Sequence, residues 1–118
     1  EDPYILKIDK EGNLNPIGIN IISQNIPNEY KLFQNFPNPF NPVTFITFEI
    51  PKVANVAFKV YDVSGREIIS INEYKKAGSY EVQFDGSNFA SGVYFYQVTA
   101  VTSGGDNFSD TKKMVLLK

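Results

Sequence analysis

The stretch Ser79-Tyr-Glu-Val-Gln-Phe-Asp85 alternates apolar and polar side chains along its length. Successive side chains of an extended chain point to opposite faces, so Tyr80, Val82 and Phe84 would share one face. Such a pattern predicts a β-strand with one face in a hydrophobic core and the other in solvent.

Further segments of the chain extend this pattern, separated by turn residues at roughly the 8–12-residue spacing that is typical of sandwiches. Residues 92–101 are apolar on both faces, which predicts a central strand. Ile68, Ile69 and Ile71 interrupt the alternation and predict a bulge. The sequence therefore predicts an all-β fold, an antiparallel immunoglobulin-like β-sandwich of about seven strands. The expected strands are Tyr30–Asn35, Thr44–Ile50, Asn55–Asp62, Arg66–Ile71, Ser79–Asp85, Gly92–Val101 and Phe108–Leu117.

The composition of the chain excludes several classes of function. Its 118 residues are enough for one domain with its own core. It contains no Cys, His or Trp, which excludes disulfides, thiol and imidazole catalysis, and zinc or haem sites built on those ligands. With 11 basic and 13 acidic side chains the net charge is −2, whereas a nucleic-acid-binding surface needs a basic excess. We therefore expect no cofactor and no nucleic-acid partner.

The N-terminal part of the chain is expected to form a separate unit. Tyr4–Asp9 is a candidate strand and residues 16–22 could form its return strand, while residues 25–29 are polar and contain a proline. A lone two-stranded hairpin is marginal in water, so residues 1–24 are expected to pack on something else or to be the remnant of an upstream domain or repeat. This predicts a hairpin segment, a linker over 25–29 and a sandwich over 30–118.

A proline-rich corner follows the first strand of the expected sandwich. The prolines of Phe36-Pro-Asn-Pro-Phe-Asn-Pro42 forbid a helix and any central ladder pairing. They also hold the preceding residues in extended geometry, and the Asn side chains can close turns. We interpret the corner as a rigid connector rather than as a polyproline ligand for another domain. Its structural residues are Pro37, Asn38, Pro39, Phe40, Asn41 and Pro42.

Short motifs occur along the chain in a particular order. They are Tyr30–Pro42, Val60-Tyr-Asp-Val-Ser-Gly-Arg-Glu67, Gly78-Ser-Tyr80, Phe84–Tyr96 and the terminal Lys112-Lys-Met-Val-Leu-Leu117. In this order they closely resemble the type A C-terminal sorting domain of cargo proteins of the type IX (Por) secretion system of Bacteroidetes-like bacteria. Each motif alone is weak, and their order over residues 30–118 makes the resemblance specific.

The resemblance implies an immunoglobulin-like sandwich without catalytic activity. Such a domain directs a folded cargo from the periplasm across the outer membrane, which implies a secreted or cell-surface protein. The implied partners are the translocon and sortase components and the upstream cargo domain of the same chain. The implied recognition residues are Gly92, Tyr94, Lys112, Lys113, Met114, Val115, Leu116 and Leu117, and Gly65 and Gly78 belong to the structural motifs.

Two of these motifs keep a second interpretation. Residues 112–118 form the last strand of the sandwich, but at a sheet edge a partner could also pair with the main chain of this strand. Tyr94 fits the core with its hydroxyl bonded to the backbone, as in a tyrosine corner. Together with Phe95 and Tyr96 it could instead form a sugar-stacking platform.

Other segments suggest different functions. Asp85-Gly-Ser-Asn88 has oxygen ligands that suit calcium, but its single carboxylate favours a turn. The hairpin expected at 4–22 could add a strand to a neighbouring copy of the chain, which would make the protein a structural or adhesive module.

Overall fold

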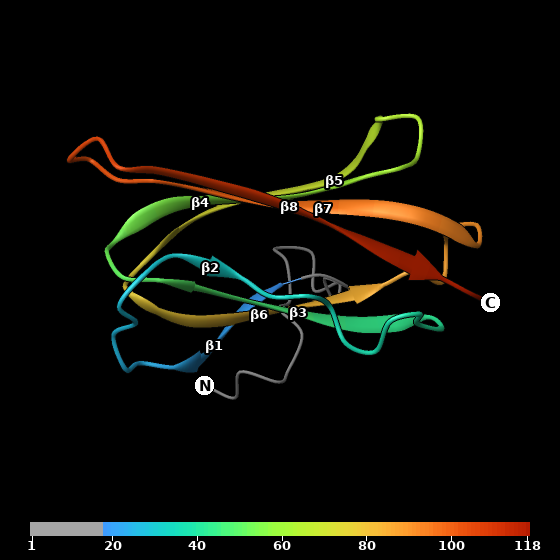
Figure 1. Cartoon of the computed structure of the whole chain (residues 1–118), viewed down its shortest axis with the longest axis horizontal. Coiled ribbons are helices and arrows are strands. Elements are labelled where there is room, and N and C mark those ends of the chain that lie inside the picture. Colours follow the sequence, from blue (N-terminus) through green and yellow to red (C-terminus); the bar gives the residue numbers. More distant parts are fainter. Residues whose placement is uncertain (1–17) are drawn as a thin grey trace, which may run out of the picture.

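Residues 18–118 are described in the computed structural model, and they fold into two antiparallel sheets that face each other (Figure 1). The strands are β1 (Ile19–Ser23), β2 (Lys31–Leu32), β3 (Val43–Ile50), β4 (Ala54–Tyr61), β5 (Glu67–Lys75), β6 (Gly78–Asp85), β7 (Gly92–Val101) and β8 (Asn107–Leu116). One sheet has the order β1-β6-β3-β2 and the other the order β5-β4-β7-β8. The predicted all-β sandwich is confirmed.

The strand predicted over Tyr30–Asn35 is much shorter in the structure. It pairs with β3 only at Lys31 and Leu32. Further along, Phe36 exchanges two backbone hydrogen bonds of 2.9 Å with Phe45. Between these two contacts, Phe33 N–H still donates to the carbonyl of Thr47 on β3 at 2.9 Å, whereas the carbonyl of Phe33 and the N–H of Asn35 bond to the Tyr96 hydroxyl on β7.

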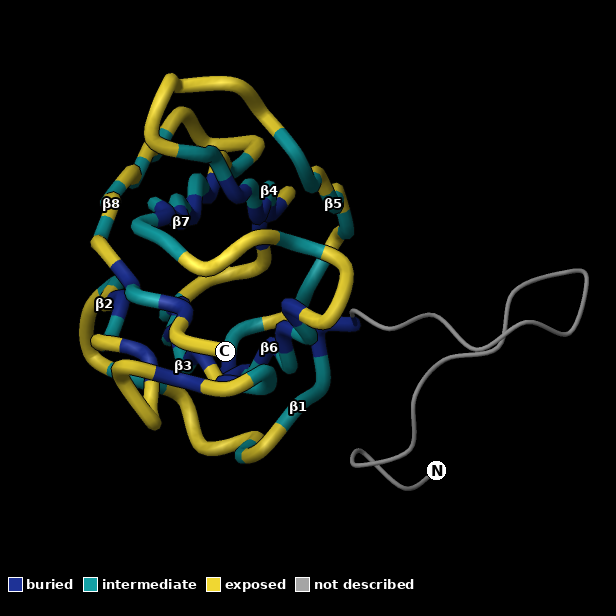
Figure 2. Tube along the Cα trace, turned by 90° about the vertical axis from the view of Figure 1, so that its right-hand side faces the viewer, coloured by how far each residue is buried: buried dark blue, intermediate teal, exposed yellow. Residues whose placement is uncertain are grey.

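The hydrophobic core lies between the two sheets. Inward side chains of the alternating strands meet between the layers, and the buried and exposed positions separate accordingly in Figure 2. Phe48 stacks on Tyr80 with ring centroids 5.5 Å apart in one sheet, and Phe58 lies 6.4 Å from Tyr96 in the other. The largest fully buried side chains are Tyr96, Phe40, Phe48, Phe58, Phe84, Ile19, Ile46, Ile50, Met114, Leu116, Val56 and Val60.

Two finer features of the predicted sheet are confirmed. β7 lies between β4 and β8, as its two apolar faces predict. The register between β4 and β5 shifts where Val60 pairs with Ile69 and Tyr61 pairs with Glu67, which leaves Ile68 as the extra residue of a bulge.

The strand β1 is an edge strand of the sandwich. It pairs with β6 from Ile19, opposite Val82, to Ser23, opposite Ser79, and Ile19 is 1% exposed. The return strand expected over residues 16–22 therefore overlaps a strand that is paired within the sandwich, and the paired sheet begins before residue 30. The hairpin partner expected at 4–9 lies outside the described residues.

The end of β1 comes unusually close to the start of β6 at Gly78. An added Cβ at Gly78 would lie 2.9 Å from the backbone oxygen of Ser23, and the φ angle there is +158°. The β1–β6 register shifts between Ile21 and Ser23, next to this contact. A side chain at Gly78 would therefore have to displace the end of β1.

We predict that Gly78→Ala lowers the free energy of unfolding by about 1–3 kcal/mol, because the new methyl group collides with backbone. A suitable control is Gly104→Ala, whose Cβ would contact only the Thr102 hydroxyl at 3.8 Å. Urea unfolding of both variants measures the difference. Equal stabilities of the two variants would contradict this account of Gly78.

Candidate functional site: the terminal strand and the proline-rich corner

The terminal strand β8 lies at one edge of its sheet, beside β7 (Figure 1). The two strands pair continuously from Val101 opposite Asn107 to Gly92 opposite Leu116. Met114 and Leu116 point inward and are fully buried, whereas the alternate residues point away from the core. The end of the chain is therefore an integral part of the sandwich.

The outer edge of this strand is covered by the proline-rich corner. Phe40 N–H donates to the carbonyl of Val115 at 2.9 Å, and Leu117 N–H donates to the carbonyl of Phe40 at 2.9 Å. These two bonds make a parallel bridge between Phe40 and Leu116. The corner thus acts as a short additional strand along the last residues of β8.

Side chains continue this cover in both directions. Gln34 Nε2 donates to the carbonyl of Lys113 at 2.7 Å, and Asn38 Oδ1 accepts the N–H of Val115 at 3.0 Å. Beyond the strand, Lys118 N–H donates to Ser91 Oγ at 2.9 Å. This edge is therefore already bonded in the folded domain, and a partner could pair with the main chain of residues 113–117 only by displacing the corner.

A buried polar network holds the corner in place. Tyr96 Oη donates to the carbonyl of Phe33 and accepts the N–H of Asn35, both at 2.8 Å. The Asn35 amide donates to Thr44 Oγ1 at 3.0 Å and to the carbonyl of Pro37 at 3.1 Å, and Thr44 Oγ1 donates to the same carbonyl at 2.8 Å. The network connects β3, β7 and the corner.

Asn35 was not among the predicted site residues, and Tyr96 was considered only for a sugar-stacking platform, which its full burial contradicts. Both lie inside quoted motifs, but alternation along a strand gives only the face of a residue and not its partner in the other sheet. Burial raises the pKa of the Tyr96 hydroxyl to about 12. The phenol is therefore a stable neutral donor to Phe33 over the physiological range.

The two predicted recognition residues of the Gly-x-Tyr motif lie at the start of β7. Tyr94 is 7% exposed, and its hydroxyl donates to the carbonyl of Ala90 at 2.6 Å. This confirms a core tyrosine bonded to the backbone, as in the tyrosine corner of immunoglobulin-like domains. Gly92 begins β7, and an added Cβ there would have no heavy atom within 4 Å.

The turn at Gly65 is shaped by Asp62. Its carboxylate accepts the N–H of Ser64 at 2.9 Å, the hydroxyl of Ser64 at 2.6 Å and the N–H of Arg66 at 3.0 Å. These bonds, the Ser64 hydroxyl first, lower the pKa of Asp62. Gly65 has φ +90°, which a residue with a side chain rarely adopts.

Asp85 forms the turn that its sequence favours. Its carboxylate accepts the N–H of Ser87 at 2.9 Å and the Ser87 hydroxyl at 2.5 Å, and these bonds lower the pKa of Asp85. Across residues 18–118, no three His, Cys, Asp or Glu side chains are grouped so that they could hold a metal ion. The Asp85 carboxylate is occupied by its own loop.

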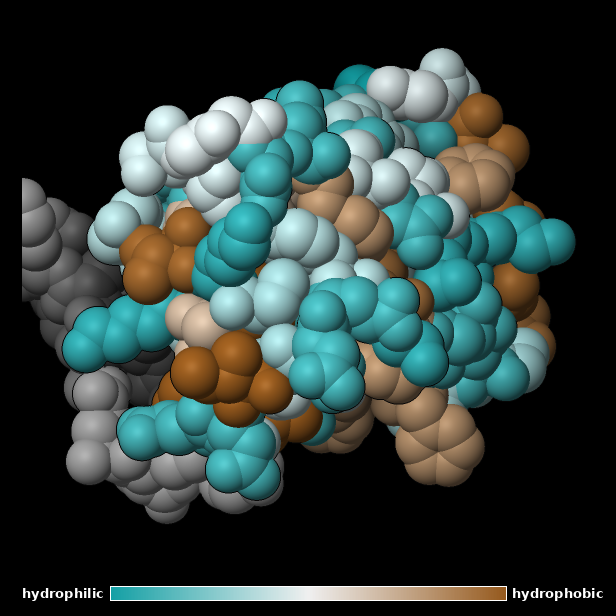
Figure 3. Space-filling model, turned by 60° about the vertical axis from the view of Figure 1, so that its left-hand side comes forward, coloured by the Kyte–Doolittle hydropathy of each residue, from teal (hydrophilic) through white to brown (hydrophobic). Residues whose placement is uncertain are grey.

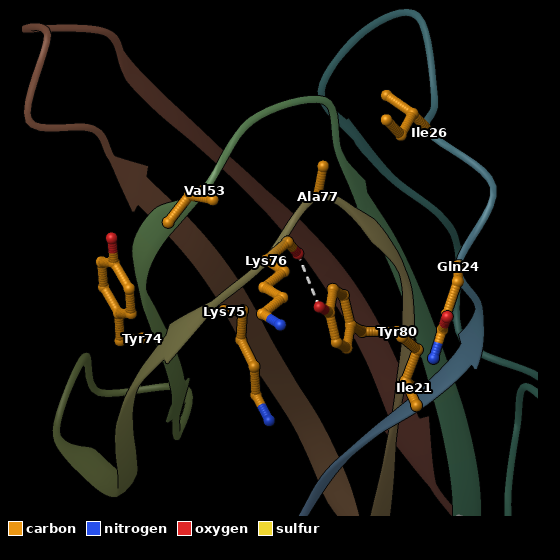
Figure 4. A pocket seen from close by; sticks show the side chains of 9 residues that line it. All are labelled: Ile21, Gln24, Ile26, Val53, Tyr74, Lys75, Lys76, Ala77 and Tyr80. Carbon is orange, nitrogen blue, oxygen red and sulfur yellow. Dashed lines mark hydrogen bonds between the residues drawn. The ribbon is translucent and has the colours of Figure 1, made fainter.

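A shallow groove of about 590 Å³ lies between the β5–β6 connection and β1 (Figure 4). The Tyr80 hydroxyl donates to the carbonyl of Lys76 at 2.5 Å, and Lys75 Nζ lies 2.8 Å from Glu73 Oε1. Figure 3 brings the left-hand end of Figure 1 forward, where apolar side chains form separate clusters among hydrophilic ones. The groove is lined by Ile21, Gln24, Ile26, Val53, Tyr74, Lys75, Lys76, Ala77 and Tyr80, which offer no pair of carboxylates for acid–base chemistry.

The sheet order, the tyrosine corner on β7 and the terminal strand built into the fold define a β-sandwich module of the immunoglobulin-like class. The chain belongs to the secretion system C-terminal sorting domain family, whose model matches residues 34–116. This confirms the family indicated by the motifs. The family is a sorting signal of secreted and cell-surface proteins rather than a catalytic domain.

Two solved structures share this fold. Dimeric latent PorU from Porphyromonas gingivalis matches 83% of the chain with a TM-score of 0.61 and 21% identity, and the chain spans 10% of the length of PorU. CopC from Methylosinus trichosporium OB3b matches 75% of the chain and 93% of its own length, with a TM-score of 0.51 and 13% identity. None of the curated proteins compared matches the chain. At these identities the two structures indicate the fold alone.

Within the described part of the chain, no helix has the length and apolarity that crossing a bilayer requires.

We predict that Asn38→Ala exposes the outer edge of β8. The Val115 N–H loses its acceptor at a solvent-exposed position, so its amide should exchange with solvent several-fold faster. This corresponds to a decrease of about 1 kcal/mol in the free energy of local opening. Asn41→Ala changes an exposed residue of the same corner and serves as the control. Amide exchange measured by NMR distinguishes the two variants, and unchanged exchange at Val115 in Asn38→Ala would argue against the cover.

We predict that Tyr96→Phe lowers the free energy of unfolding by about 1–3 kcal/mol at neutral pH. The Asn35 N–H would lose its acceptor and the carbonyl of Phe33 its donor, both inside the fold. Tyr61→Phe is the control, because the Tyr61 hydroxyl makes only a 3.4 Å contact with Gln97. Urea unfolding measures both variants.

The raised pKa of Tyr96 also makes this difference depend on pH. An unfolded chain loses the Tyr96 proton near the ordinary pKa of 10.0 and the folded chain near about 12, so the folded state holds more protons between these values. The stabilisation is complete below pH 10 and is lost as the pH rises through about 12. The stability difference between the wild type and Tyr96→Phe should therefore shrink above about pH 10 in urea titrations. A difference that stays constant would contradict the assigned pKa shift.

Proposed function

We propose that this chain is the C-terminal address of a larger protein, which it directs across the outer membrane through the type IX secretion system. The observation that carries the proposal is the sorting-domain family match over residues 34–116. The domain acts as a recognised surface and has no catalysis of its own. Its partners are the translocon and a sortase, and the cargo is the part of the protein that precedes this domain.

The structure of the terminal strand supports this proposal. Residues 112–117 are held in one conformation by β7 on one side and by the proline-rich corner on the other. A translocon that accepts folded cargo needs a rigid signal, because ordering a flexible segment on binding costs affinity. The destination of the protein in this proposal is the cell surface or the medium, after passage through the periplasm.

The proposal predicts export of a fused reporter. The full 118-residue chain is attached to the C-terminus of a folded reporter in a bacterium that has type IX secretion. The reporter should reach the medium or the cell surface. Removal of residues 112–118 should leave it in the periplasm, since the deletion takes away Met114 and Leu116 from the core. Fractionation followed by immunoblotting measures the distribution.

A control shows whether a modest loss of stability by itself reduces export. Ile46→Val removes one methylene from the core on β3 and costs about 0.5–1.5 kcal/mol without touching the terminal strand. Export of this variant should stay close to that of the intact chain. Retention of the intact fusion in the periplasm would contradict the proposed function, and export of the truncated fusion would contradict the role of the terminal strand.

A further inference from the structure

The outer face of the sheet β5-β4-β7-β8 carries an apolar patch near the end of the chain. The strand register places Tyr61 beside Phe95 and Val93 beside Val115, all pointing away from the core. We call these four residues the outer patch. Leu117, which follows β8, is 54% exposed.

Polar side chains follow the outer patch in the middle of the same face. Further along the same strands, Lys59 lies beside Gln97 and Gln97 beside Thr111. In the next row, Thr99 lies beside Ser109. These polar rows separate the outer patch, which adjoins the chain end, from Val101 and Tyr74 at the other end of the face, which are 41% and 70% exposed.

The charge of this face is opposite to that of the chain. The outward positions of this sheet include Lys59 and Lys113 and one carboxylate, that of Glu67 on β5, which lies opposite Tyr61 and 3.5 Å from Lys59 Nζ. The outward positions of β3 and β6 on the other sheet include Glu49, Glu81 and Asp85. Since the whole chain has a net charge of −2, Lys113, which lies opposite Phe95, gives this side of the outer patch a charge opposite to that of the chain. A complementary surface would be apolar and would carry a carboxylate that faces Lys113.

Several other parts of the terminal motifs are not accessible in the folded domain. Tyr94, Met114 and Leu116 are buried, and the edge of β8 from Lys113 to Leu117 is bonded to the proline-rich corner. A partner that reads the folded domain at this end meets the outward side chains of β7 and β8.

We propose that the outer patch, together with Lys113, is the surface by which the folded domain is recognised. Its partner is an apolar protein surface that bears carboxylates and belongs to the export apparatus. Recognition uses side chains on the sheet face, and no strand is added at the β8 edge. The inference rests on the function proposed above and specifies the site at which that function is exerted.

The test uses the reporter fusion with the full chain. Three separate substitutions change the patch and its cation: Phe95→Ser, Val115→Thr and Lys113→Glu. Val115→Thr keeps the β-branched shape of the side chain and replaces a methyl group with a hydroxyl. Its effect on export can therefore be interpreted even if Phe95→Ser disturbs the sheet. Each patch variant should reduce the exported reporter about tenfold, with an unchanged thermal unfolding midpoint of the purified chain.

Matched controls lie elsewhere on the same molecule. Val101→Thr makes the same chemical change as Val115→Thr, on the same face but at the far end of β7, where Val101 is 41% exposed. Lys76→Glu reverses an exposed charge on the β5–β6 connection. Both controls should export the reporter within about twofold of the unmodified chain.

The outcomes separate this inference from the proposed function. If the unmodified fusion is exported and the patch variants match their controls, the outer patch is not the recognition surface while the proposed function stands. If the unmodified fusion is not exported, the proposed function itself fails. Flotation of the purified chain with vesicles containing phosphatidylglycerol tests a membrane as the partner. Vesicle binding that is lost in Phe95→Ser would overturn the assignment to a protein.

Discussion

The cover over the edge of the terminal strand depends on the hydrogen bonds between Tyr96 and the residues before the proline-rich corner. Tyr96 Oη bonds to both Phe33 and Asn35 at 2.8 Å. These bonds hold the segment that follows β2 against β7. Because β8 is the next strand after β7 in the sheet, the corner then reaches the edge of β8. Without this buried connection, nothing in the two-residue strand β2 would hold the corner there.

The same arrangement divides the family motifs into two roles. In Gly92-Val-Tyr-Phe, Tyr94 points into the core while its two neighbours point into solvent. In the terminal strand, Met114 and Leu116 are buried and Lys113 and Val115 face outward. Substituting a buried motif residue changes the stability of the domain, whereas substituting an outward one changes its surface. A motif that looks continuous in the sequence therefore combines residues that fold the domain with residues that a partner can reach.

Most of the strands could be predicted from the sequence because each depends on local alternation. Apolar and polar side chains alternate regularly in Thr44–Ile50 and Ser79–Asp85. The two apolar faces of β7 and the bulge at Ile68 can also be predicted from neighbouring residues. The pairing of β1 with β6 could not be predicted in this way, since a short apolar segment can pair with any free edge. The closure of β8 was also missed, because the contact of Phe40 with Val115 joins residues far apart in the sequence.

The edges of both sheets show why this closure matters for a domain without disulfides. An open edge offers unpaired N–H and carbonyl groups to any other strand, so folded proteins shorten, bulge or cover their edges. Here β2 has only two residues, β5 is bulged at Ile68, and β8 is covered by the corner over its last residues. A signal that had to be read through an open β8 edge would also pair with unintended strands. Side chains on the outer face avoid this conflict, because specificity there comes from shape and charge rather than from main-chain groups that every protein shares.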